Sequence, residues 1–208
     1  MKRIIVGISG ASGTIYGIRL LEVLRQIGGI ESHLILSRGA RITMEHETSI
    51  PPDSVGQLAD VCHSPENLAA CLSSGSFRTD GMVVAPCSIK SLSMIANSID
   101  DNLLVRAADV TLKERRKLVL IVRETPLHLG HLRHMTSVTE MGAIILPPVP
   151  SFYHSPKTIE DIIDQTIGKV LDQFDINHSL FQRWTGKSGW KNATKPGRLG
   201  RISCQRKE

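Results

Sequence analysis

The chain has 208 residues, of which 41% are hydrophobic and 22% are charged, with a net charge of +5. This length suits one domain with a full core, and no run of about 18 apolar residues could span a membrane. The start Met1-Lys2-Arg3 leads into an apolar stretch too short for a signal peptide. We therefore expect a soluble, cytoplasmic protein with no membrane contact.

The positive charge is concentrated at the end of the sequence. Residues 187–208 hold seven cations and one anion, whereas residues 1–186 hold 18 cations and 19 anions, a net charge of −1. A basic segment with several glycines and little apolar content cannot bury a core. We therefore predict a folded domain over 1–186 and a disordered tail over 187–208, and no nucleic-acid binding.

Apolar runs typical of buried strands alternate with amphipathic segments along most of the chain. This alternation predicts an α/β fold with a doubly wound, mainly parallel sheet and helices on both faces. The predicted strands cover residues 4–6, 33–36, 81–85, 118–122 and 143–146. The predicted helices cover residues 12–27, 40–47, 65–73, 88–99, 102–116, 127–140 and 158–174.

The first strand leads into a turn with the spacing G-x-x-G-x-x-G over residues 7–13. Free N–H groups at a helix N-terminus attract anions, and Ser9 and Ser12 add hydroxyl donors. The spacing differs from G-x-G-x-x-G and from the Walker loop, and the second strand ends in Ser37-Arg38 without an acidic residue for a ribose. These features favour a mononucleotide phosphate, such as that of a flavin. The alternative is a turn kept only for close packing.

Two further strand ends carry polar groups, and ligands of open α/β sheets lie at such ends. Residues 86–91 follow the third predicted strand and open a helix, so their hydroxyl and N–H groups could hold a phosphate or a ring carbonyl. Arg123 and Glu124 follow the next strand, where an arginine suits a phosphate and a glutamate could move protons. Taken singly, Ser88 could be only a helix cap and the two charges only solvated. Their shared position at one sheet edge favours a site.

Other reactive residue types carry weaker signals. His128, His131 and His134 form an H-x-x-H-x-x-H pattern, but their directions drift around the helix and no carboxylate completes a ligand shell. Cys87 stands beside a proline at a strand end, which favours a packed small residue over a reactive thiol. The four cysteines show no metal-ligand spacing, so we expect reduced thiols and no metal.

In combination, these motifs resemble the UbiX/Pad-type flavin prenyltransferases. The resemblance extends over residues 1–184. The motifs together are specific to this family, whereas the glycine turn alone is a weak indication. It is carried by GASG at 10–13, PCS at 86–88, RAADV at 106–110, LKERR at 112–116, RETP at 123–126, GAIILP at 142–147 and FYH at 152–154.

The resemblance implies two substrates, FMN and dimethylallyl monophosphate. The implied FMN contacts are Gly10, Ala11, Ser12, Ser37, Ser88, Ile89, Lys90, Ser91 and Arg123. Tyr153 and Lys169 would meet the phosphate of the second substrate, with Arg106 and Lys113 adding positive charge. Family members commonly have arginine at the position of Lys169, and lysine keeps the charge but loses the planar fork.

The implied reaction joins the dimethylallyl group to N5 and then to C6 of reduced FMN, which yields prenylated FMN for a UbiD-type aromatic-acid decarboxylase. Ser12, Glu47 and Glu124 are the implied catalytic residues, with Glu124 and Ser12 relaying protons. Phe77 or Trp184 would shelter the allyl group, and no metal is needed.

Two other functions remain open at this point. One is a flavin-dependent cysteine decarboxylase, although those enzymes typically have Pro-Ala-Met-Asn where residues 86–89 read Pro-Cys-Ser-Ile. The other is a non-catalytic FMN-binding subunit of a phenolic-acid decarboxylase.

The resemblance also implies a homo-oligomer built on trimers, up to a dodecamer, with the flavin site at subunit contacts.

Overall fold

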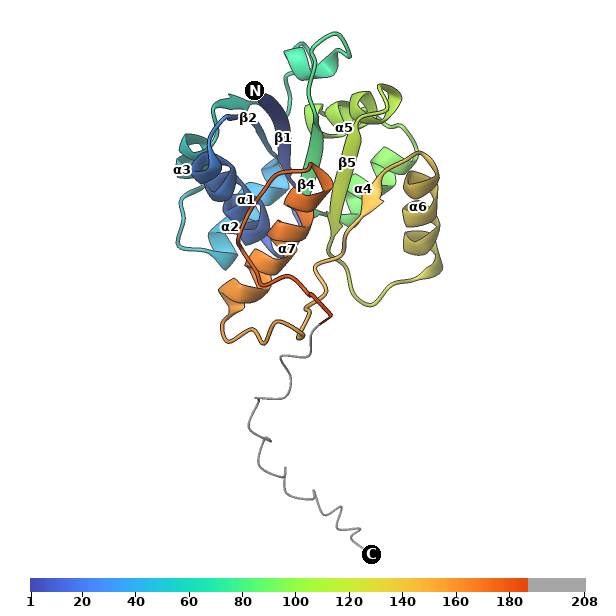
Figure 1. The fold of residues 1–208 in the computed structure, drawn as a ribbon. Helices are drawn as coiled ribbons and strands as arrows, with labels where there is room; N and C mark the ends of the chain where they lie inside the picture. Colours follow the sequence, from blue (N-terminus) through green and yellow to red (C-terminus); the bar gives the residue numbers. More distant parts are fainter. Residues whose placement is uncertain (187–208) are drawn as a thin grey trace, which may run out of the picture.

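In the computed structural model, which describes residues 1–186, six parallel strands form one sheet in the order β3-β2-β1-β4-β5-β6 (Figure 1). The predicted α/β fold with a parallel sheet is therefore confirmed, while the predicted tail over 187–208 lies outside the described residues. The strands are β1 (Lys2–Ile8), β2 (Ile30–Leu36), β3 (Val61–His63), β4 (Gly81–Cys87), β5 (Lys117–Val122) and β6 (Ile144–Ile145).

Helices connect these strands and cover both faces of the sheet (Figure 1). They are α1 (Thr14–Ile27), α2 (Arg38–Glu47), α3 (Pro52–Val55), α4 (Ile89–Ala96), α5 (Leu103–Lys113), α6 (Leu129–Glu140) and α7 (Ile159–Gln173), with 3₁₀ turns η1 (Gly56–Leu58) and η2 (Cys71–Ser73). Within residues 1–186, none of the helices combines the length and apolar character that a membrane span requires.

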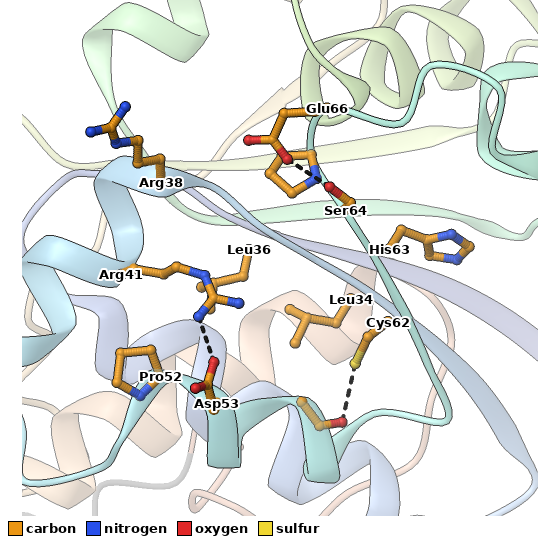
Figure 2. Close-up of a pocket in the computed structure, with 12 residues that line it drawn as sticks. Leu34, Leu36, Arg38, Arg41, Pro52, Asp53, Cys62, His63, Ser64 and Glu66 are labelled. Atoms are coloured by element: carbon orange, nitrogen blue, oxygen red, sulfur yellow. Dashed lines mark hydrogen bonds and ion pairs between the residues drawn. The ribbon is translucent and has the colours of Figure 1, made fainter.

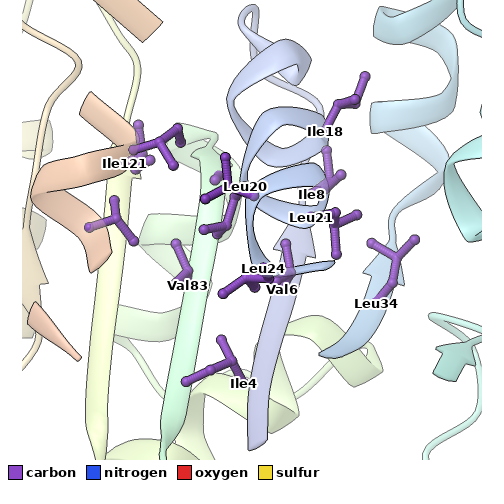
Figure 3. Close-up of a cluster of buried hydrophobic side chains, with 14 of the residues drawn as sticks. Ile4, Val6, Ile8, Ile18, Leu20, Leu21, Leu24, Leu34, Val83 and Ile121 are labelled. Carbon is purple, nitrogen blue, oxygen red and sulfur yellow. The ribbon is translucent and has the colours of Figure 1, made fainter. Parts of the chain in front are cut away.

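The sheet separates two hydrophobic cores, because successive side chains of a strand point to opposite faces. Ile4, Val6 and Ile8 of β1 face the first core with α1, α2 and α7 (Figure 3). Ile5 faces the second core with α4, α5 and α6. Burial on both faces explains why the strands read as continuous apolar runs. Helix α1 lies close to β4, since a Cβ at Gly17 would stand 2.3 Å from the Ala85 carbonyl oxygen.

One predicted element is wrong, and some short observed elements were not predicted. The helix predicted over 65–73 is absent, and only the turn η2 (Cys71–Ser73) forms there. The side chain of Asn67 accepts a bond from the Ala69 N–H and turns the chain locally, while the Pro65 carbonyl is taken by the N–H of Leu103. Strand β3 was not predicted, because it is short and its first two residues are exposed.

Candidate functional site

Four neighbouring strands end at the same edge of the sheet, which we call the carboxyl edge, and hydrogen bonds join these ends. The N–H of Ser37 donates to the last carbonyl of β1 over 3.0 Å, and the N–H of Arg123 donates to the last carbonyl of β4 over 3.2 Å. The N–H of Ser88 donates to the hydroxyl of Ser9 over 2.8 Å. The structure thus brings the glycine turn, Ser37, Ser88 and Arg123 to one edge.

Ser9 serves this framework and is not available to a ligand. Its side chain donates to the Pro86 carbonyl over 2.8 Å, accepts from the Ser88 N–H, and belongs to a residue that is 1% exposed. The prediction that Ser9 adds a donor for an anion is therefore wrong, because its hydroxyl proton is already committed within the protein.

The glycine turn is packed against the start of α2. A Cβ at Gly10 would lie 2.9 Å from the carbonyl carbon of Gly39, so this contact requires a residue without a side chain. Gly13 has a φ of 97°, a left-handed conformation that glycine adopts without steric cost. Close packing and backbone conformation thus explain why glycine is required at these two positions. This explanation does not exclude a ligand beside the turn.

A carboxylate of the protein itself occupies the N-terminus of α1. One Glu47 oxygen accepts bonds from the N–H groups of Gly13, at 2.8 Å, and Thr14, at 3.2 Å. Burial favours a higher pKa for Glu47, but hydrogen bonds from Ser12, Gly13 and Thr14 outweigh it and lower the pKa. Glu47 is therefore ionised at neutral pH and fixes the turn that carries Ser12.

Two predicted flavin contacts are also helix caps. The Ser37 hydroxyl accepts a bond from the Ala40 N–H over 3.1 Å at the start of α2. The Ser88 hydroxyl accepts from the Ser91 N–H over 3.2 Å and donates to the Ser91 hydroxyl over 3.1 Å at the start of α4. The capping explanation for Ser88 is therefore correct, and each cap holds its hydroxyl in one position at the carboxyl edge.

The cations of this edge are exposed, and no carboxylate within residues 1–186 forms an ion pair with Arg123 or Lys90. Burial raises the pKa of Tyr16 on α1, and the positive charge of Arg123 acts in the opposite direction. Because this effect requires the two groups to be near each other, the Arg123 guanidinium lies near α1. Sequence reasoning missed Tyr16, although its place on the first turn of α1, three residues after Gly13, could have indicated it. A phosphate would find unpaired positive charge here.

Glu124 lies beside Arg123 and is partly buried. One of its oxygens accepts a bond from the N–H of Thr125 over 3.0 Å. The second oxygen has no such bond among the described residues, so it is available to a proton donor at this edge.

Tyr153 and Trp184 lie together in the loop after β6 and the segment after α7. Their rings are 6.1 Å apart at an angle of 79°, and both are largely exposed, at 48% and 67%. Lys169 extends from α7, with its Nζ 3.7 Å from Asp172. Asp172 also binds Arg183 and His178, so it leaves Lys169 only part of a counter-charge.

Three predicted residues are not brought to the carboxyl edge of the same chain. Arg106 binds Asp100 over 2.8 Å and faces the segment around η2. Lys113 ends α5 just before β5 begins, which places it at the opposite, amino edge of the sheet (Figure 1). Phe77 packs under the guanidinium of Arg3, 4.4 Å from the ring centre, so it does not reach the carboxyl edge of its own chain.

Two lesser expectations concern single residue types. Within residues 1–186, His128, His131 and His134 do not converge as ligands, and His128 instead accepts a bond from the Gly130 N–H. Cys87 is fully buried, and this burial raises its pKa to about 12, as expected for a packed thiol.

A cavity of about 520 Å³ opens beside this edge, between β2, β3, α2 and α3 (Figure 2). Arg38 and Arg41 line it, and Arg41 is bound to Asp53 over 2.7 Å. The residues shown around the cavity include none of the predicted flavin contacts. We therefore take the hydrogen-bonded strand ends, not this cavity, as the candidate site, because the predicted flavin contacts lie there.

A parallel sheet with anion donors at its carboxyl edge defines a nucleotide-binding α/β protein. A model of the Flavoprotein family matches residues 1–185. The flavin prenyltransferase UbiX of Salmonella typhimurium is 60% identical over 188 residues, which are 89% of this chain and 100% of that protein. The chain belongs to the Flavoprotein family and, within it, to the UbiX-type flavin prenyltransferases.

Solved structures give the same result. AnUbiX (PadA1) in complex with FMN and dimethylallyl pyrophosphate has a TM-score of 0.87 and 49% identity, covering 89% of this chain and 98% of that one. A dodecameric FMN-dependent UbiX-like decarboxylase from Escherichia coli O157:H7 has a TM-score of 0.87 and 47% identity, covering 88% and 100%. FMN-dependent cysteine decarboxylases such as TvaF are only 16% identical, and this likeness shows the fold alone.

Proposed function

We propose that this protein transfers the dimethylallyl group of dimethylallyl monophosphate to N5 and C6 of reduced FMN. The observation that carries the proposal is the match to a flavin prenyltransferase over that protein's whole length at 60% identity. The unpaired cations beside the hydrogen-bonded strand ends support it, because both substrates carry a phosphate.

The hydrogen-bond donors at the carboxyl edge suit FMN. Gly10, Ala11 and Ser12 would line one side of the flavin, with Ser37 beside them. Ser88, Ile89, Lys90 and Ser91 would bind from the start of α4, and Arg123 would bind from the end of β5. Reduced FMN supplies the nucleophilic nitrogen and carbon when it is bound.

The chain's own residues would control the allylic phosphate. Breaking the allylic C–O bond leaves a phosphate dianion, which the charge of Lys169 and the hydroxyl of Tyr153 would stabilise. Trp184, next to Tyr153, would shelter the allyl group from water. Glu124 and Ser12 would move protons at the acceptor, while the ionised Glu47 would hold Ser12 in place.

Arg106 and Lys113 serve this function only in an oligomer. Within one chain they do not reach the carboxyl edge, so we propose that a neighbouring copy presents them to it in an assembly built on trimers. We also propose that residues 1–186 form the catalytic domain, that the protein works in the cytoplasm, and that the product passes to a UbiD-type decarboxylase. A similar E. coli protein is a dodecamer, which supports the assembly.

Anaerobic incubation of the protein with reduced FMN and dimethylallyl monophosphate tests this function. Mass spectrometry of the extracted flavin should show the gain of one five-carbon unit, with inorganic phosphate released in equal amount. Protein-free and oxidised-FMN reactions are the controls. Bound FMN that never changes mass would overturn the proposal, and it would favour a non-catalytic flavin subunit or, with decarboxylation of a cysteine peptide, the cysteine decarboxylase alternative.

A further inference from the structure

A cluster of three metal-ligand side chains lies on β2, β3 and η2, and none of its residues is a proposed flavin contact. Ring nitrogens of His33 and His63 and the sulfur of Cys71 all lie within 4.8 Å of one another. His33 is four residues before Ser37 along β2, a separation of about 13 Å at roughly 3.3 Å per residue. His33 is thus separated from the proposed flavin contacts, while His63 ends β3 and lines the cavity beside the carboxyl edge.

The two ring nitrogens are already close to the spacing that a tetrahedral zinc ion requires. Zn–N bonds of about 2.0–2.1 Å and Zn–S bonds of about 2.3 Å place such atoms about 3.3–3.6 Å apart. Nδ1 of His33 and Nε2 of His63 are 2.9 Å apart, and the rings stack with centres 5.2 Å apart. For zinc the two nitrogens would separate by a few tenths of an ångström, and the Cys71 sulfur, which lies within 4.8 Å of both, would be drawn to about 3.6 Å.

The carboxylate of Glu31 already orients His33, the most buried of the three residues. Two guanidinium nitrogens of Arg3 donate to the Glu31 carboxylate, over 3.0 and 2.9 Å. The Glu31 carboxylate thus accepts the Nε2–H of His33 over 2.7 Å, which leaves the Nδ1 lone pair directed at His63. Carboxylate–histidine pairs of this kind fix the tautomer of metal-binding histidines.

The other two ligands are accessible and suited to a metal. His63 is half-buried, and its Nε2 lies 2.9 Å from Nδ1 of His33. Cys71 is an exposed, free cysteine, so its sulfur can be reached by an ion from solvent. Phe77 covers the site from one side, with its ring 5.4 Å from that of His33.

We propose that His33, His63 and Cys71 bind a Zn²⁺ ion, with a fourth position left to water. Two imidazoles and one thiolate form a ligand set that selects zinc over Mg²⁺ or Ca²⁺. On binding, the Cys71 thiol releases its proton to solvent and the proton of His63 moves from Nε2 to Nδ1, so the His33–His63 hydrogen bond breaks and both facing nitrogens bind the ion. The site adds a metal where the sequence patterns predicted none, and it does not depend on the prenyl transfer.

Metal titration of the untagged, reduced, full-length chain tests the proposal without any activity assay. Co²⁺ is the spectroscopic probe, because a Cys71 thiolate ligand produces a sulfur-to-cobalt charge-transfer band. The unmodified chain should bind about one Zn²⁺ that displaces Co²⁺, and Glu31→Gln should weaken binding about 10–100-fold. His63→Gln and Cys71→Ser should weaken it by at least about 100-fold.

Cys62→Ser is the matched control, because Cys62 is also on β3 but bonds to the Gly56 carbonyl instead of facing the cluster. It should retain the charge-transfer band, as should the unmodified chain. Circular dichroism should confirm that each variant is folded, which is expected because Cys71 is exposed and His63 only half-buried. The proposal is overturned if the unmodified chain binds no stoichiometric metal, or if Cys71→Ser keeps the band.

Discussion

The carboxyl edge consists of two regions that use their polar groups differently. At the ends of β1 and β4, Ser9 and Ser88 are bound to the protein itself, and Ser9 is almost fully buried. At the end of β5 and in the following loops, Arg123 and Tyr153 are exposed, and Arg123 has no ion pair within residues 1–186. The first region thus serves as a rigid framework, and the second supplies the charge for the substrates.

The two regions should therefore respond differently to mutation. A change in the framework should lower the stability of the fold, whereas a change in the exposed region should lower activity with little effect on stability. The variants below test this separation.

Glu124→Gln should have the largest effect, and on turnover alone. Removing a proton-transfer group slows a reaction by about 10²–10⁴-fold, whereas the amide can still accept the Thr125 N–H bond. The rate of prenylated-flavin formation and the Kd for FMN are the two measurements. Glu140→Gln, at the exposed end of α6, is the control. Loss of FMN binding together with turnover would assign Glu124 to the framework instead.

Ser9→Ala should lower the free energy of unfolding by about 1–3 kcal/mol, because the N–H of Ser88 loses its buried partner. Urea unfolding of the FMN-free protein at fixed concentration measures this. Ser54→Ala removes an exposed hydroxyl that bonds to the Pro51 carbonyl, and its effect should stay within about 0.5 kcal/mol. Equal effects of the two substitutions would contradict the framework role of Ser9.

Glu47→Gln should produce a smaller and pH-dependent loss of stability, below about 1 kcal/mol because the carboxylate is partly exposed to solvent. The folded-state pKa of Glu47 is lowered from 4.5, so its stabilisation is present above that value and is lost as pH falls through the folded pKa. Unfolding at neutral pH should therefore distinguish the variant from the unmodified chain, and unfolding in acid should not. Glu45→Gln, on the exposed side of α2, should show no such dependence.

The sequence indicated the sheet but not the contacts that depend on the fold. Buried strands such as β4 are visible as apolar runs, and their parallel order places their ends together. Glu47 caps a helix that begins 33 residues earlier, and His63 meets His33 from 30 residues away. No local pattern reports such pairs. The prediction of a helix over 65–73 was wrong for a related reason. Turns around Asn67, and a hydrogen bond from the distant N–H of Leu103, compete with the local helix propensity.

Lys169→Arg should have the smallest effect, and it should be a gain. The lysine presents one point charge, whereas an arginine can bind a phosphate with two parallel N–H bonds. Lys169 is half-exposed and only 3.7 Å from Asp172, so a longer guanidinium has room and a partner that orients it. We expect KM for dimethylallyl monophosphate to fall about threefold, on the order of 0.7 kcal/mol, with kcat and the Kd for FMN nearly unchanged. Lys157→Arg, in the exposed loop before α7, is the charge-matched control and should leave KM unchanged. An unchanged KM in Lys169→Arg would show that Lys169 does not bind the phosphate. Phosphate binding would then fall to Tyr153 and the cations of a neighbouring copy.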